Sequence, residues 1–220
     1  GNIDMLNMKK TMATLLAVVC ISSSTFCLTV DAASYSSTKA VNYAVTWAES
    51  FNSNYTKQDQ DCTNFVSQCI SAGNVPYYYS IASGLIGNLK SGCSSGRSDE
   101  WYHIKNKNKE NTWSSTWTVV DKSGSKDGLH RYLGKSKKTT YKKTDVSWNK
   151  DRYKDIHVGD VIQLSYDKGS TYGHSIIVSK IENKEVYYCG HTSARKNYKL
   201  SSSLSYGGNN YISIYTPSAN

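Results

Sequence analysis

The chain has 220 residues, enough for one domain of ordinary size after a processed leader. Hydrophobic residues make up 38% and charged residues 20% of the sequence, a balance that excludes an intrinsically disordered chain. The formal net charge of +9 favours anionic partners such as wall polymers, membrane surfaces or nucleic acid. The lysines are dispersed or in short runs, without an arginine-rich recognition helix, so we expect no nucleic-acid partner.

Residues 1–32 are predicted to be a leader with a signal peptide, and residues 33–220 the folded domain. Met8-Lys9-Lys10 supplies a positive start, an apolar run follows, and Val30-Asp31-Ala32 offers small residues for cleavage. The apolar run is too short to predict a membrane span, so we expect secretion without stable membrane insertion. The expected partner of this exported, monomeric, cationic domain is peptidoglycan or another anionic polymer of the cell envelope.

Four cysteines remain after the leader is removed, which is few for a disulfide-stapled scaffold. A Cys62–Cys69 disulfide is excluded because seven residues along a helix span about 10 Å. A Cys93–Cys189 disulfide remains open. The sequence has neither CxxC nor HExxH spacing, so we expect neither a metal nor an organic cofactor.

Two helices are predicted at the start of the domain. Apolar residues at helical spacing between Ser37 and Phe51 indicate an amphipathic helix with one buried face. A second helix is expected to begin at Asp61 and to end at Gly73, a residue that favours helix C-termini. Its apolar face carries Cys62, and its polar residues are expected on the other side.

Residues 80–158 lack a regular pattern, apart from a short helical signal at Leu129–Leu133. Stretches rich in Gly, Ser and Lys surround four tryptophans in this region. These aromatic residues could contact substrate from a loop-rich insertion, or they could pack in the core beneath long surface loops, and we favour the second interpretation. They are Trp101, Trp113, Trp117 and Trp148.

From Gly159 onward the pattern changes to strands, with β-branched and aromatic residues separated by turn signals. Asp167-Lys168-Gly169 and Glu182-Asn183-Lys184 are typical of hairpin connections. Helices followed by an antiparallel sheet predict an α+β fold. The expected strands are Val161–Tyr166, Ser175–Ile181, Val186–Cys189 and Tyr211–Tyr215.

Cys62 is the candidate nucleophile. It lies in the first turn of the second predicted helix, where the positive end of the backbone dipole stabilises a thiolate. Asp61 occupies the N-cap position, a favoured place for Asp. The thiolate is the nucleophilic form, so this location suits covalent catalysis. Most free cysteines are small buried apolar residues, and we interpret Cys69, in mid-helix, in that way.

Among the five histidines, His174 is the candidate base. It opens the strongest predicted strand, at the edge of the sheet where a helix N-terminus can meet it. His191 ends the next predicted strand, and in a hairpin the start of one strand neighbours the end of its partner. His191 could therefore orient His174 as the third member of a Cys–His–polar triad.

The segment Asp61–Cys69, with the sequence DCTNFVSQC, resembles the signature of the Putative amidase domain family of secreted bacterial proteins. These proteins are relatives of the NlpC-type and CHAP-type cell-wall peptidases. The resemblance covers nearly all of residues 36–215, although residues 80–112 look longer and richer in Gly and Ser than expected. Supporting matches, in order, are Ala40–Ala44 with Trp47, Ser115–Trp117, Gly159–Gln163, Gly173–Ser175 and Gly190–Ser193.

The resemblance implies a papain-like fold, with Cys62 as nucleophile and His174 as general base. His191 matches the third, polar member, which varies among relatives as His, Asn, Gln or an acid, and another Asp or Asn could serve instead. Asp160 is interpreted as a turn residue rather than a catalytic one. The implied activity is hydrolysis of amide bonds in stem peptides or crossbridges of peptidoglycan.

The expected mechanism passes through an acyl-enzyme. His174 takes the proton from Cys62, the thiolate attacks the amide carbonyl, and the backbone N–H of Cys62 stabilises the oxyanion. His174 then protonates the leaving amine, and water releases the acyl group. The candidates for a second oxyanion donor are Gln58, Gln60, Asn42 and Tyr55.

Two other functions remain open. The acyl group could pass to an amine, which would make the protein a transamidase. Alternatively, the chain could be a wall-binding module or secreted effector without hydrolase activity. The intact pair of Cys62 and His174 argues against the second, because a binding module has no need of it.

Overall fold

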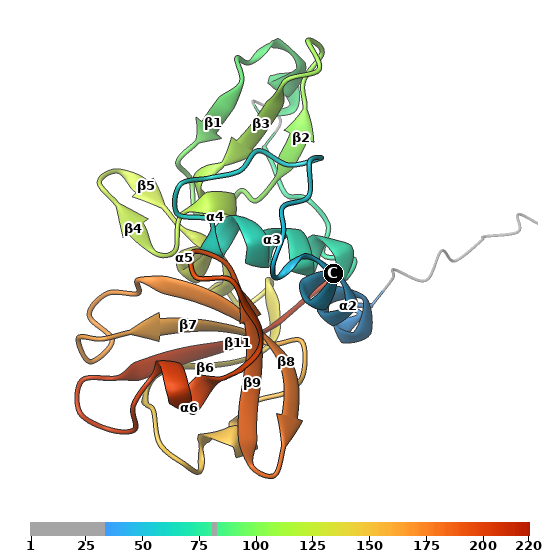
Figure 1. Cartoon of the computed structure of the whole chain (residues 1–220). Helices are drawn as coiled ribbons and strands as arrows, with labels where there is room; N and C mark the ends of the chain where they lie inside the picture. The colour runs from blue at the N-terminus through green and yellow to red at the C-terminus, as the bar shows by residue number, and fades with distance from the viewer. Residues whose placement is uncertain (1–33, 81–82) are drawn as a thin grey trace, which may run out of the picture. The chain divides into compact units, whose positions relative to one another are not determined.

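The structure of the chain is a computed structural model that describes residues 34–80 and 83–220 (Figure 1). The predicted leader, residues 1–32, lies outside the described residues. Within the described ranges, no helix combines the length and the apolar character needed to cross a membrane.

A six-stranded antiparallel sheet is built from the C-terminal part of the chain, in the order β10-β9-β8-β7-β11-β6. Four of its strands were predicted, with ends within one or two residues. The unpredicted ones, β6 and β10, are the two edge strands, and their exposed polar residues hide the strand pattern. The strands are β6 (Thr139–Ser147), β7 (Val161–Ser165), β8 (His174–Glu182), β9 (Glu185–Gly190), β10 (Arg195–Lys199) and β11 (Tyr211–Pro217).

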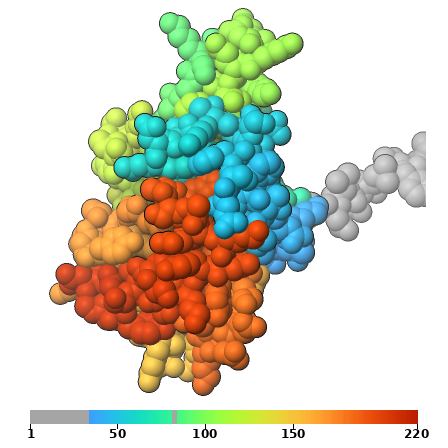
Figure 2. Space-filling view, in the orientation of Figure 1, coloured from blue at the N-terminus to red at the C-terminus, as the bar shows by residue number. Residues whose placement is uncertain are grey.

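Two helices pack against this sheet, as predicted. The first, α2 (Ser37–Trp47), ends four residues before the predicted Phe51. The second, α3 (Cys62–Ala72), has Asp61 and Gly73 as its caps. Figure 2 shows the blue and cyan atoms of the helical segments adjoining the orange and red atoms of the C-terminal sheet. The structure thus confirms an α+β fold of N-terminal helices on an antiparallel sheet.

The middle of the chain forms a second layer, which covers the side of α3 away from the large sheet (Figure 1). It contains a small three-stranded sheet and short helices, and the predicted turn of helix at Leu129–Leu133 is confirmed as α5. Its elements are η1 (Ser83–Asn88), β1 (Gly92–Ser95), β2 (His103–Lys105), β3 (Asn111–Ser114), α4 (Ser115–Thr118), β4 (Lys122–Ser123), β5 (Lys126–Asp127) and α5. Two further short helices, η2 (Arg152–Asp155) and α6 (Leu200–Ser203), accompany the large sheet.

The aromatic residues of this middle region belong to the core, which confirms the favoured interpretation. Trp101 and Trp117 are fully buried, and Trp113 packs against them from the edge. As a result, α3 is enclosed on both sides, and every residue from Cys62 to Ile70 is buried. The polar side of α3 is therefore buried as well, because the second layer covers it.

The large sheet separates two hydrophobic cores. Side chains alternate along a strand, so that in β8 Ile177 joins one core while Ile176 and Val178 join the other. We call the first the helix-side core, which includes Ala44, Phe65, Cys69, Trp101, Trp117, Val161, Ile177 and Cys189. We call the second the outer core, which includes Trp148, Ile162, Leu164, Ile176, Val178, Val186, Leu200 and Ile212.

Candidate functional site

Cys62 is the first residue of α3, and only 4% of it is exposed. The first N–H groups of a helix have no acceptor within the helix, so Cys62 lies at the positive end of the backbone dipole of α3. The sulfur contacts the Thr63 hydroxyl, with 3.8 Å between Sγ and Oγ1. Cys62 is thus a buried residue at the N-terminus of α3.

His174 is the first residue of β8 and lies opposite Leu164 of β7. Burial lowers the pKa of its imidazole below the ordinary value, because desolvation disfavours the charged ring. A neutral imidazole can accept a proton near neutral pH. The side chain lines a surface hollow of about 490 Å³, which we call the His174 hollow.

A hydrogen-bond chain joins the start of α3 to the start of β8. Ser175 donates its hydroxyl proton to Gln163 Oε1 at 2.8 Å, so the bond of 2.8 Å between Thr63 Oγ1 and Ser175 Oγ has Thr63 as its donor. All three side chains are buried. Cys62 and His174 immediately precede the two bonded residues in the sequence.

Tyr166 is a neighbour of His174 in the His174 hollow. Its pKa is raised by burial, by Tyr188 and by the negative charge of a Cys62 thiolate. No hydrogen bond joins Cys62 to His174 among the described residues, and such bonds commonly tighten only when substrate binds.

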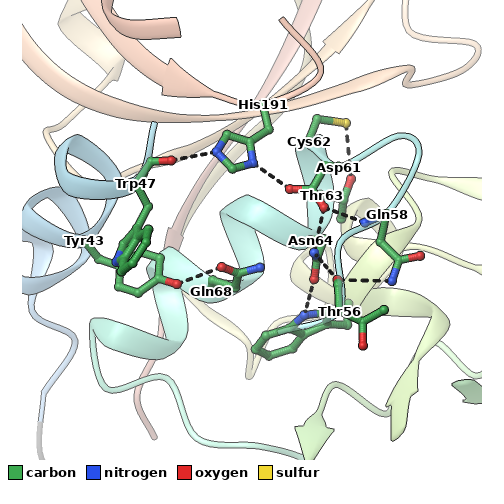
Figure 3. Close-up of polar contacts among 11 residues, drawn as sticks. Tyr43, Trp47, Thr56, Gln58, Asp61, Cys62, Thr63, Asn64, Gln68 and His191 are labelled. Atoms are coloured by element: carbon green, nitrogen blue, oxygen red, sulfur yellow. Dashed lines mark hydrogen bonds and ion pairs between the residues drawn. The ribbon is translucent and has the colours of Figure 1, made fainter. Parts of the chain in front are cut away.

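Asp61 has a larger role than the expected N-cap. Only 2% of it is exposed, and its side chain makes no capping bond to the helix backbone. Instead, its Oδ1 accepts hydrogen bonds from the backbone N–H of Gln58 at 2.9 Å and from Asn64 Nδ2 at 2.8 Å (Figure 3). The carboxylate thereby ties the loop before α3 to the first turn of the helix.

His191 completes this arrangement from the end of β9. Its Nδ1 lies 2.6 Å from Asp61 Oδ2, its Nε2 lies 2.8 Å from the carbonyl oxygen of Trp47, and Figure 3 shows the ring between the two. The ring also stacks on Phe65, with centroids 4.0 Å apart. Because an acceptor faces each nitrogen, both bonds form together when both nitrogens carry a hydrogen. His191 thus connects the end of α2 to the start of α3.

The pairing of β8 with β9 places the start of β8 beside the end of β9, as predicted. However, both ring nitrogens of His191 are bonded to groups other than His174. The triad role of His191 therefore stays a prediction, and the contact present is with Asp61. Sequence reasoning missed this pairing, although an Asp directly before the candidate nucleophile was a usable signal.

The structure also gives the positions of Asp160, of the candidate oxyanion donors and of the cysteines. Asp160 lies in the turn before β7, where Oδ2 accepts from the backbone N–H of His157 at 2.7 Å and Oδ1 from the Thr216 hydroxyl at 2.7 Å. Among the candidate oxyanion donors, Gln58 is the one bonded to Asp61 beside Cys62. All four cysteines of the described residues are free thiols, so Cys93 and Cys189 are not paired.

Comparisons with known proteins place these features in a family context. The model of the family described as Putative amidase domain matches residues 34–216. The uncharacterized protein YjcM of Bacillus subtilis (strain 168) is 28% identical over 198 residues, which cover 84% of this chain and 39% of that protein. The chain therefore spans well under half the length of this curated relative. No solved structure matches the chain.

Proposed function

Because the chain belongs to the Putative amidase domain family, we propose that it is a secreted cysteine amidase that hydrolyses peptide-type amide bonds of peptidoglycan through Cys62 and His174. The family match supports amide hydrolysis. The proposed location and substrate are supported by the leader-like N-terminus and by the net charge of +9, which suits an anionic wall polymer.

One observation carries the choice of catalytic residues. The bonded pair of Thr63 and Ser175 fixes the first turn of α3 against the first residues of β8. Cys62 and His174 precede these two residues, and we propose that the bond sets the distance between the thiol and the imidazole. A cysteine at a helix N-terminus beside a histidine on an antiparallel strand is also the arrangement of a papain-like fold, which we propose for this domain.

The mechanism follows from these positions. Neutral His174 removes the proton from Cys62, and the thiolate sulfur attacks the carbonyl carbon of the scissile amide. The N–H of Cys62, at the positive end of α3, stabilises the oxyanion. His174 then gives its proton to the leaving nitrogen, the C–N bond breaks, and a thioester remains. A water molecule, deprotonated by His174, cleaves the thioester and restores both residues.

Asp61 and His191 support this chemistry as positioning residues. Their contact of 2.6 Å is buried, with about 5% of either side chain exposed. It holds the loop that leads into Cys62 and connects that loop to the end of α2 at Trp47. We propose that this pair fixes the position of the thiol, and that it performs the orienting task of a triad through Cys62 rather than through His174.

The test is product analysis after incubation of the purified protein with peptidoglycan, using mass spectrometry. We expect new fragments with one free amine and one free carboxyl group per cut, and a loss of at least about 1,000-fold in Cys62→Ser. The matched control is Cys93→Ser, an exposed free thiol in the small sheet, which should keep full activity.

The alternatives predict different products. A transamidase would join an added amine to the acyl group instead of releasing a carboxyl group. A wall-binding module would bind peptidoglycan equally in the wild type and in Cys62→Ser without any product. Fragments that persist in Cys62→Ser, or the absence of fragments across several wall chemotypes, would remove the proposed function.

A further inference from the structure

The His174 hollow has an unusual balance of charge. Arg195 is the charged residue in its lining, and no carboxylate side chain lines it in the described part of the chain. Thr192, Ser193, Ser202 and Ser203, which carry hydroxyl groups, also line it. A hollow with a cation, hydroxyl groups and no acid suits an anionic ligand group.

Arg195 differs from the other arginines in its pairing. Arg97, Arg131 and Arg152 each form an ion pair with at least one aspartate. Arg195 forms none among the described residues, and its guanidinium instead packs on the ring of Tyr198, with 4.2 Å from Cζ to the centroid. Packing on an aromatic face holds the plane of the guanidinium and leaves its N–H groups at the rim free to donate.

A neighbouring hollow has the opposite character. It measures about 270 Å³ and is lined by Glu49, Asp59 and Asp61, with Lys57 as its lysine. Thr192 lines both hollows and lies between them, with a positive φ of 80°. The hollow lined by Asp61 thus carries carboxylates, whereas the His174 hollow carries a cation and no carboxylate.

We propose that Arg195 binds a free carboxylate of the substrate, so that the enzyme selects peptides whose carboxylate near the scissile amide is unmodified. The guanidinium offers two parallel N–H groups, a geometry that matches a carboxylate. This inference rests on the proposed function for its substrate class, a peptide of the cell wall. It adds a specificity-determining residue that neither the family match nor the catalytic pair identifies.

The test measures binding apart from catalysis. The full chain carrying Cys62→Ser is titrated by calorimetry with soluble stem peptides that have free carboxylates, and with the same peptides after their carboxylates are converted to amides. We expect the carboxylate form to bind about 10- to 100-fold more tightly, the range for hydrogen bonds to a charged partner. Adding Arg195→Gln should remove this preference, and Arg195→Lys should keep part of it.

Lys196→Gln is the matched control. It removes the same charge one residue further along β10, where Lys196 Nζ lies 3.9 Å from Glu49 Oε2 and does not line the hollow. The preference for carboxylates should survive this change. Equal losses in Arg195→Gln and Lys196→Gln, equal binding of both peptide forms, or no binding of either form would each overturn the proposal.

The outcome separates this inference from the proposed function. The protein could show a carboxylate preference that depends on Arg195 and yet give no Cys62-dependent products. In that case the proposed hydrolase activity is wrong, and Arg195 is a ligand-binding residue. With active enzyme, the same preference should appear in kcat/KM for the two peptide forms. If hydrolysis depends on Cys62 but is equally fast for both peptide forms, the proposed function stands and the proposed role of Arg195 is wrong.

Discussion

The two faces of the large sheet are packed in different ways. The outer core consists mainly of Ile, Leu and Val side chains, which make van der Waals contacts with one another. On the helix side, polar side chains of α3 each have a specific partner from another element. Asn64 Oδ1 accepts from Trp117 Nε1 at 2.9 Å, and Gln68 Oε1 accepts from the Tyr43 hydroxyl at 2.7 Å.

The two kinds of packing have different consequences, one for the stability of the domain and the other for the position of α3. An aliphatic core tolerates changes of shape, because neighbouring side chains can repack with a small shift of the backbone. A buried polar pair tolerates little movement, since each group loses its partner when the distance changes. The helix that carries Cys62 is therefore held by contacts that fix its position, and the outer core supplies stability without setting the geometry of the site.

The largest expected effect is the loss of the carboxylate at the start of α3. Asp61→Ala leaves His191, the N–H of Gln58 and the amide of Asn64 without their acceptor. Each buried donor that is left without its acceptor costs about 1–3 kcal/mol of unfolding free energy, so the combined loss should be the largest of the variants considered. Urea unfolding monitored by tryptophan fluorescence measures this loss.

Asp59→Ala is the control for this change, because Asp59 is an exposed carboxylate two residues away in the same loop. Its cost should stay within about 0.5 kcal/mol, as for most surface substitutions. Equal costs for Asp61→Ala and Asp59→Ala would mean that the buried pair does not organise the site.

A pair of tryptophan substitutions compares the two cores directly. Trp117 donates its indole N–H to Asn64 on the helix side, and Trp148 donates its own to the carbonyl of Leu204 in the outer core, both at 2.9 Å. Each Trp→Phe change removes buried volume and leaves an acceptor unpaired, which should cost about 2–3 kcal/mol.

The two variants should differ in activity although they resemble each other in stability. Trp117→Phe leaves Asn64 Oδ1, in the first turn of α3, without its donor, so the rate of peptidoglycan hydrolysis should fall. Trp148→Phe should keep its rate when the assay temperature is well below the unfolding midpoint. Equal rates in both variants would show that the helix-side polar pairs do not set the geometry at Cys62.

The helix side should also determine how stability depends on pH. His103 is 6% exposed, stacks near Trp113 and Trp117, and burial lowers its pKa from 6.5 to about 4. The unfolded chain then binds a proton more readily than the folded one, so this stability is present above pH about 6.5 and is lost as the pH falls towards 4. At pH 5 the loss is roughly 2 kcal/mol.

His103→Phe keeps an aromatic ring and removes the titration. Unfolding free energies at pH 5 and pH 8 should therefore differ by about 2 kcal/mol less in the variant than in the wild type. Part of the acid sensitivity should remain, because burial also lowers the pKa of His130 and His174. An unchanged difference between the two pH values would contradict the assignment to His103.

The sequence predicted the elements with strong periodicity and clear ends. Gly73 marked the end of α3, and Asn183 and Lys184, both with positive φ, form the turn of the β8–β9 hairpin. The edge strands β6 and β10 were missed, because exposed polar residues dominate them.

The partners of α3 could not be predicted for a different reason. Asn64 and Gln68 look like solvent-facing residues in the sequence, yet Trp117 and Tyr43 reach them from distant segments. His191 and Asp61 are 130 positions apart, and their contact depends on where the end of α2 lies. A local sequence pattern shows which helix or strand such a residue belongs to. It does not show which distant residue it contacts, because that contact forms only when the layers pack together.

The smallest expected effect tests the link between the two candidate catalytic elements. Thr63→Val keeps the shape of the side chain but removes the hydroxyl that donates to Ser175, which still donates to Gln163. The loss of one buried hydrogen bond should cost about 1 kcal/mol of stability. If this bond aligns Cys62 with His174, kcat should fall while KM changes little, because the loss falls on the transition state.

The control for this variant is Thr112→Val, a fully buried threonine in β3 whose hydroxyl lies 3.5 Å from the carbonyl oxygen of Lys90. It removes the same group away from α3 and should leave kcat unchanged. A fall in kcat confined to Thr63→Val would assign the bond to alignment of the site. If the two variants have the same kinetics, the Thr63–Ser175 bond does not align the site. Cys62 and His174 would then be positioned by Asp61, His191 and the backbone alone.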